Sequence, residues 1–139
     1  MIKRIKKVVV SVMAVGMLLG GVMPVQANID HTSRLEWSRN SSTHLVQATP
    51  HGRRTGTTRL TSIRLRIRSN AVTVVNGVAT NNVTEHPWST HDDPRHGIEY
   101  PGIRRSRTIR QGFVESHVAI RPLNSVNFIG EQRLRQSFN

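Results

Sequence analysis

Residues 61–68 alternate between uncharged side chains and arginine, and this pattern constrains the fold more than any other feature of the sequence. One parity holds Thr61, Ile63, Leu65 and Ile67, and the other holds Arg64, Arg66 and Arg68. Successive side chains of a β-strand point to opposite faces of a sheet. The period of two therefore predicts a half-buried strand with its arginines on the solvent side.

This register makes two substitutions differ in their effects. Leu65→Asp would bury an unpaired charge and cost several kcal/mol of folding stability. Arg66→Glu, as an ordinary surface change, would alter the stability by about half a kcal/mol or less.

Other segments also favour strands. Asn76-Gly77 lies between the β-branched runs VTVV and VAT, and Asn-Gly is typical of a two-residue type I′ hairpin turn. Residues 107–121 alternate as well, with a change of parity at Gln111-Gly112 that predicts a β-bulge within one strand. Pro122 is expected to end that strand because it has no backbone N–H for the ladder.

The two ends of the remaining chain are less regular. Residues 28–54 are expected to begin as a loosely structured segment in which Leu35 and Trp37 are tucked in. The last residues, 123–139, are compatible with a short helix or a final strand, and we favour the strand because a sheet needs its edge covered. The predicted fold is all-β, a small antiparallel sandwich or barrel.

Residues 1–27 have the features of a secretory signal peptide. A basic start, MIKRIKK, precedes an apolar run from Val8 to Met23, and Val25 and Ala27 occupy the small positions of a cleavage site. The apolar run is short for a bilayer-spanning helix, and no basic cluster follows it. We therefore expect one domain, residues 28–139, that is secreted without a transmembrane segment.

The charge of this domain indicates its partners. The basic residues Lys3, Arg4, Lys6 and Lys7 lie in the signal segment, so 16 of the 20 basic residues remain against all 8 acidic ones, a formal charge of about +8. All 16 are arginine, which binds phosphate, sulfate and carboxylate in bidentate fashion, although a bias in codon usage would give the same composition. There is no cysteine, which excludes disulfides, thiol catalysis and cysteine-based zinc sites.

The basic stretches supply the candidate binding residues, which are Arg53, Arg54, Arg59, Arg64, Arg66, Arg68, Arg104, Arg105, Arg107 and Arg110. The partners expected for an exported protein are an anionic cell-wall polymer, anionic lipid headgroups or an acidic glycan. Nucleic acid is less favoured, because Trp88 and Tyr100 lie between the basic stretches and no stacking aromatic lies inside them. A solvated face that only keeps the protein soluble remains the alternative.

Residues 86–99, HPWSTHDDPRHGIE, concentrate side chains that could bind a metal ion, and the candidate ligands are His86, His91, Asp92 and His96. Their spacing matches no metal motif, and Pro87 and Pro94 argue against a helix. The alternative is a solvated turn in which the aspartates cap backbone amides and pair with Arg95.

No nucleophile or phosphate-loop motif is present in the sequence. The sequence therefore favours a secreted cationic binding protein, without a cofactor, that is retained at the cell envelope by charge. The alternative is a small secreted metal-dependent hydrolase or bacteriocin-like toxin that uses residues 86–99.

Overall fold

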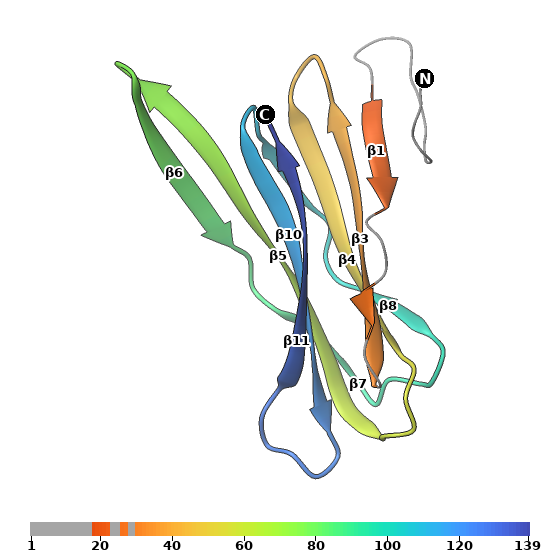
Figure 1. Ribbon diagram of the computed structural model, residues 1–139. Coiled ribbons are helices and arrows are strands. Elements are labelled where there is room, and N and C mark those ends of the chain that lie inside the picture. Colours follow the sequence, from red (N-terminus) through yellow and green to blue (C-terminus); the bar gives the residue numbers. More distant parts are fainter. Residues whose placement is uncertain (1–17, 23–25, 28–29) are drawn as a thin grey trace.

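The computed structural model describes residues 18–22, 26–27 and 30–139, and this part of the chain is all-β. Its strands form two antiparallel sheets that pack face to face (Figure 1). The first sheet, called the β3 sheet, contains β1 (Leu18–Val22), β2 (Gln26–Ala27), β3 (His31–Asn40), β4 (Leu45–Arg54), β8 (Glu99–Pro101) and β9 (Arg105–Thr108). The second, called the β5 sheet, contains β5 (Leu60–Val75), β6 (Val78–Glu85), β7 (Ser89–Asp92), β10 (Gly112–Pro122) and β11 (Ile129–Phe138). The predicted all-β sandwich is confirmed.

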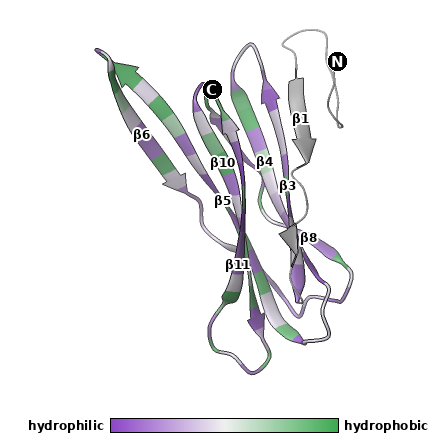
Figure 2. Ribbon diagram, in the orientation of Figure 1, coloured by the Kyte–Doolittle hydropathy of each residue, from purple (hydrophilic) through white to green (hydrophobic). Residues whose placement is uncertain are grey.

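The core lies between the two sheets and follows the period of two. Ile63, Leu65 and Ile67 on β5 are at most 1% exposed, and the arginines between them point to the opposite face of the sheet. Hydrophobic and hydrophilic positions alternate along β5 and β10 in Figure 2. The buried apolar residues form two clusters, which contain Leu35, Val46, Ala48, Ile67, Ile109, Val114 and Phe138 in one and Leu60, Ile63, Leu65, Val118 and Ile120 in the other.

The predicted Asn-Gly hairpin is present between β5 and β6. Val75 pairs with Val78, and the two turn residues Asn76 and Gly77 have φ values of 51° and 78°, as a type I′ turn requires. The last residues also form the expected strand, β11, which pairs with β10 and covers one of its edges.

Residues 28–54 differ from the prediction of a loosely structured segment. Strands β3 and β4 occupy residues 31–40 and 45–54, and they pair in continuous register from His31↔Arg54 to Arg39↔Val46. The alternation of β3 was missed because its inward positions include the polar His31 and Ser33, which are 0% and 2% exposed. Leu35 and Trp37 do pack inward, as expected.

The prediction of one bulged strand over residues 107–121 is wrong as well, because these residues belong to two separate strands. β9 pairs with β4 in the β3 sheet, whereas β10 pairs with β5 and β11 in the β5 sheet. The chain crosses from one sheet to the other at Ile109, which is fully buried in the core. The change of parity in the sequence therefore marks a change of sheet. β10 ends at Pro122, as predicted.

The predicted signal peptide, residues 1–27, lies largely outside the described residues. Its described parts are β1 and β2, which both pair with β3. Within the described ranges, no helix has the length and apolar character needed to cross a bilayer.

Gly112 is the residue whose backbone most limits substitution at the crossing between the sheets. Its φ is 150°, and a Cβ added there would lie 1.9 Å from the backbone oxygen of Asn70 on β5. Gly77 also has a positive φ, but a Cβ added there would meet no atom within 4 Å.

We therefore expect Gly112→Ala to lower the free energy of unfolding by more than about 3 kcal/mol, since the β5–β10 ladder must open to relieve the clash. Gly77→Ala is the matched control and should cost about 1–2 kcal/mol, the penalty for an alanine in the left-handed region. Urea denaturation of both variants measures the difference. Equal losses would contradict the close approach of β10 to β5.

Candidate anion-binding face

The outward side of the β5 sheet carries most of the charged groups of β5, β10 and β11. Cross-strand register places Glu115 opposite Arg68 and Arg135, and His117 opposite Arg66 and Arg133. We call this surface the arginine face. In the described part of the chain its arginines are Arg64, Arg66, Arg68, Arg121, Arg133 and Arg135, and its carboxylates are Glu85, Asp92, Glu115 and Glu131.

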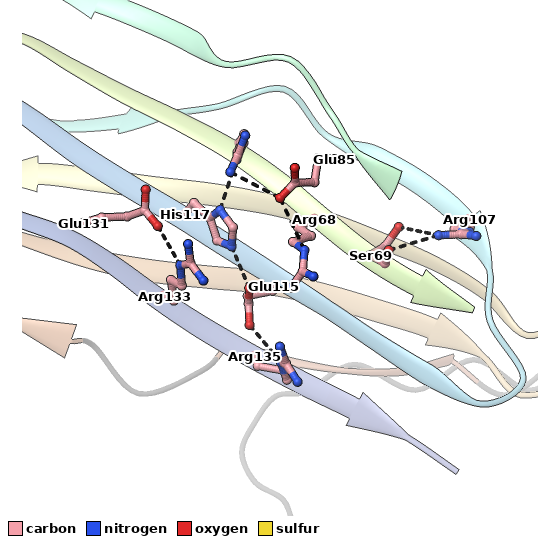
Figure 3. A network of polar contacts seen from close by, with 10 residues as sticks. Arg68, Ser69, Glu85, Arg107, Glu115, His117, Glu131, Arg133 and Arg135 are labelled. Carbon is pink, nitrogen blue, oxygen red and sulfur yellow. Dashed lines mark hydrogen bonds and ion pairs between the residues drawn. The ribbon is translucent and has the colours of Figure 1, made fainter. Parts of the chain in front are cut away.

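A buried histidine–carboxylate pair on β10 lies at the centre of this face. Nε2 of His117 lies 2.6 Å from Oε1 of Glu115, and these residues are 0% and 4% exposed. The other carboxylate oxygen of Glu115 accepts a hydrogen bond of 2.8 Å from Nε of Arg135. Nη1 of Arg68 lies 3.6 Å from Oε1 of Glu115. Figure 3 shows the Glu115 side chain reaching between His117 and Arg135.

The protonation state of His117 follows from its two neighbours. Nε of Arg66 donates to Nδ1 of His117 over 3.0 Å, so Nδ1 carries no proton and Nε2 donates to Glu115. Burial lowers the pKa of His117, and the hydrogen bond to Glu115 offsets this only in part. Burial alone would raise the pKa of Glu115, but hydrogen bonds from His117 and Arg135 outweigh it and lower that pKa. His117 is thus neutral and Glu115 ionised.

Glu85 links two members of the arginine row from the end of β6. Its Oε2 lies 3.4 Å from Nη2 of Arg66 and 3.4 Å from Nε of Arg68. The side chains of Arg66 and Arg68 are only 18% and 26% exposed. The arginines lie on the outward side of the sheet, as predicted, but two carboxylates, one histidine and several rings cover much of their side chains.

Aromatic rings hold most of the other guanidinium groups in place. The guanidinium carbon of Arg64 lies 4.1 Å from the ring centroid of Trp88 and 4.2 Å from that of Phe128. Arg66 lies 4.3 Å from the Trp88 centroid, and Arg135 lies 3.7 Å from the Phe113 centroid. The aromatic side chains that seemed absent from the basic stretches are brought to them by tertiary structure.

No local pattern in the sequence connects Trp88 with the arginines. β7 pairs with β5 with Ser89 opposite Leu65, which places Trp88 next to Arg66. Phe128 reaches Arg64 from the segment before β11. These contacts depend on long-range strand pairing, which residue spacing does not encode.

Arg64 differs from its neighbours in having no carboxylate within ion-pair distance among the described residues. Its Nε is buried and has no hydrogen-bond partner within this part of the structure. Burial lowers the pKa of Arg64 from its ordinary value. Arg64 is thus a partly desolvated cation held between two rings, and the carboxylate of Glu131 acts on its charge only from beyond ion-pair distance.

The other predicted arginines lie away from this face. Arg53 and Arg54 end β4, and Arg59 precedes β5 with Asp93 at 4.0 Å. Arg104 donates to Oγ1 of Thr49, whereas Arg107 donates to the backbone oxygen and hydroxyl of Ser69. Arg105 lies on β9 and Arg110 in the turn that follows it. The structure thus brings together only three of the ten predicted residues, namely Arg64, Arg66 and Arg68. It adds Arg121, Arg133 and Arg135.

The outward face of the β3 sheet has a second polar cluster, which is balanced in charge. Arg34 contacts both carboxylate oxygens of Glu99, at 3.0 Å through Nε and 2.6 Å through Nη2. The hydrogen bond from Arg34 is the main reason that the pKa of Glu99 lies below its ordinary value. His51 lies 2.8 Å from Glu36 and 3.5 Å from Glu99. Arg53 is opposite Glu99 on the same face, so two carboxylates here face two arginines and one histidine.

The predicted metal ligands are not gathered at one point. Nε2 of His91 lies 2.7 Å from the backbone oxygen of Pro101, and Nε2 of His96 lies 2.8 Å from that of Thr55. Asp92 accepts a hydrogen bond from the hydroxyl of Ser62. The pKa of His86 is lowered by burial and by the charges of Arg105 and Arg107. No three His, Asp or Glu side chains in the described ranges are arranged to hold a metal ion.

Comparison with known proteins gives little further information. No family model matches the sequence. No curated protein matches it either. Among solved structures, the sporulation control protein Spo0M from Bacillus subtilis is similar to this chain with a TM-score of 0.33 and 10% sequence identity. That match covers 78% of this chain and 48% of Spo0M, so this chain spans about half the length of that protein.

The burial of Arg66 changes the effect expected of its substitution. Arg66→Glu would remove the donor to Nδ1 of His117 and place a second carboxylate beside Glu85. We expect it to lower the free energy of unfolding by about 2–4 kcal/mol, because a buried hydrogen bond to a charged group is lost and a repulsion is gained.

Arg110→Glu, at an exposed turn position, makes the same change of charge and should stay within about half a kcal/mol of the parent chain. Thermal or urea unfolding of both variants provides the test. Equal stability of the two variants would show that the network around His117 contributes nothing to folding.

The His117–Glu115 pair should also make the fold sensitive to acid. The pKa of His117 is lowered in the folded chain, so the unfolded chain takes up this proton first as the pH falls. Stability is therefore retained at neutral pH and lost as the pH falls below about 6.5, the ordinary histidine pKa. His117→Gln keeps one donor and one acceptor but does not titrate.

The urea midpoint measured between about pH 7.5 and about pH 5.5 should thus fall less in His117→Gln than in the parent chain. His31 and His86 also have lowered pKa values and are present in both proteins, so the difference isolates His117. Identical slopes would contradict a neutral, buried His117.

Proposed function

We propose that this chain is an exported cationic binding protein and that its arginine face docks on an anionic polymer of the cell envelope. One observation carries the proposal: within the described residues, this face has six arginines and four carboxylates, and His117 adds no charge. The opposite outward face is balanced, because Arg34 and Arg53 there face the carboxylates of Glu36 and Glu99. The positive excess is therefore directional.

The rings on the arginine face favour binding over mere solubility. A guanidinium stacked on an aromatic ring is held in one orientation, so less side-chain entropy is lost when its N–H groups engage an anion. Arg64 is already partly desolvated and has no carboxylate partner among the described residues, so an incoming anion would not have to displace one. A solvated face would need neither the stacking nor the unpaired cation.

Repeating phosphate groups fit such a surface best. Arginine makes bidentate contacts to phosphate, and the outward arginines of β5 are two residues apart, about 7 Å along the strand, so a chain of anions can engage several at once. We therefore favour a teichoic-acid-like wall polymer, with an acidic glycan or anionic lipid as the alternatives that the binding test separates. The signal-like segment 1–27 supports export, and charge would retain the protein at the envelope.

The test compares two pairs of substitutions that remove the same charge. Arg121→Gln with Arg133→Gln alters the arginine face, and Arg53→Gln with Arg95→Gln alters exposed positions elsewhere. Binding to purified teichoic acid, heparin and anionic vesicles is measured over a range of salt concentrations. We expect the first pair to weaken binding to teichoic acid about tenfold, or about 1.4 kcal/mol, and the second pair to have much less effect.

Affinity should also fall steeply as the salt concentration rises, since binding releases counterions. Equal losses in the two pairs would show that net charge alone drives binding and that no particular face is used. Tighter binding to vesicles or heparin than to teichoic acid would reassign the ligand. Affinity that does not depend on salt would rule out the ionic mechanism.

A further inference from the structure

The β5–β6 hairpin is unlike the rest of the molecule in its exposure and charge. Every residue of β6 is exposed, and Val74, Val75 and Val78 near the turn are 61–66% exposed. Figure 1 shows this hairpin extending away from the rest of the sandwich. From Ser69 to Thr84 the sequence contains no Asp, Glu, Lys, Arg or His. An uncharged ribbon with exposed valines at its tip thus projects from a strongly basic protein.

β6 is also an edge strand with free backbone groups. It pairs with β5 on one side, and the strand order β11-β10-β5-β6 leaves its other side without a partner in the described chain. The residues that flank a two-residue turn exchange both ladder bonds, so Val78 and every second residue after it face β5. Consistent with this alternation, the amide of Val72 donates to Gln111 and not to β6. Ala79, Asn81 and Val83 therefore direct their N–H and C=O groups to the free side.

This edge lacks the features that usually prevent pairing between chains. It has no proline, no bulge and no charged side chain before Glu85. Side-chain amides also tie it to β5, since Asn70 donates to Asn81 and Asn82 donates to the backbone oxygen of Ala71. The other end of the sheet differs, because β11 carries Glu131, Arg133 and Arg135.

The geometry points to a second copy of this chain as the partner, with β6 pairing antiparallel to β6 of the other copy about a twofold axis at Asn81. In that register Asn81 faces its own equivalent, Ala79 faces Val83, and Thr80 faces Asn82. Val78 then faces Thr84, no charged side chain opposes another, and Glu85 lies opposite Gly77 of the hairpin turn. The strand is self-complementary, as a twofold interface requires.

The charge of the chain does not prevent two copies from pairing at this edge. Two chains of about +8 repel each other through most of their surfaces, and the β5–β6 hairpin is where they can approach without opposing like charges. A basic partner would be repelled in the same way, and an acidic partner would prefer the arginines over this neutral edge.

Pairing of this kind has a structural consequence for the arginine face. The twofold axis of an antiparallel strand pair is perpendicular to the sheet, so the outward faces of both copies lie on the same side. The β5 sheets would join into one continuous sheet with two arginine faces side by side. A polymer that spans both faces would bind more tightly, because attachment to the first face raises its effective concentration at the second. The dimer itself does not rest on the proposed function, and its test uses no ligand.

The absence of native cysteine allows a direct test of the register. Asn81→Cys should form a disulfide-linked dimer under mild oxidation, because directly opposite residues lie about 5.5 Å apart between Cα atoms, within disulfide range. Thr80→Cys is the matched control: it faces Asn82 and not itself, and should form little covalent dimer. Val126→Cys, at an 88% exposed position far from β6 in sequence, reports random collision.

The oligomeric state of the whole chain is measured by light scattering and sedimentation. We expect a dimer that Asn81→Lys and Asn81→Glu each convert to monomer, because like charges then face each other on the axis. Mixing these two variants should restore a dimer through the opposite charges, whereas Val126→Lys should remain dimeric. A monomeric parent chain, or a dimer that persists in Asn81→Lys, would overturn the proposal. Equal cross-linking of Thr80→Cys and Asn81→Cys would overturn the register.

Discussion

A carboxylate buried on the outward face of β10 holds the arginine face together. Glu115 is 4% exposed and lies among His117, Arg68 and Arg135, so its desolvation is offset by charged and neutral donors at once. His117 in turn accepts from Arg66, which reaches Glu85 on β6. This chain of contacts ties β6, β5, β10 and β11 together on the side of the sheet that faces away from the core.

The two sides of the β5 sheet are therefore stabilised by different interactions. The inward side buries Ile63, Leu65 and Val118 against the β3 sheet, where the hydrophobic effect dominates. The outward side has a polar layer in which guanidinium groups cover the rings of Trp88, Phe113 and Phe128. Because arginine carries an apolar stem and a planar head, it can serve both as the cover of the sheet and as a surface for anions.

The same layer explains why the charges of the protein are unevenly distributed. Carboxylates are placed where they organise arginines and are too few to neutralise them, which leaves Arg64 between two rings without an acidic partner in the described structure. The uncharged hairpin adjoins this layer on the same sheet, so a positive surface and a neutral edge lie next to each other. Anion binding and self-association would thus use separate parts of one sheet.

The sequence by itself determined the strand class and much of the local geometry. The alternation at 61–68 fixed which side chains of β5 enter the core, Asn76-Gly77 fixed the hairpin, and Pro122 fixed the end of β10. These features are local, because side-chain period and turn chemistry depend on adjacent residues. Strand β3 was missed because two of its inward residues are polar, and the crossing at Ile109–Gly112 looked like a bulge because a change of sheet also changes parity.

Only the tertiary structure decided what the outward side of β5 touches. Trp88, Glu85 and His117 reach Arg66 through three different strand pairings, and none of these registers can be derived from spacing along the chain. The sequence therefore specified that the arginines point away from the core, because one face of a strand must be buried. The pairing of distant strands decided that these arginines stack on aromatic rings, form hydrogen bonds and are partly buried. Cross-strand neighbours are set by register and not by proximity in sequence.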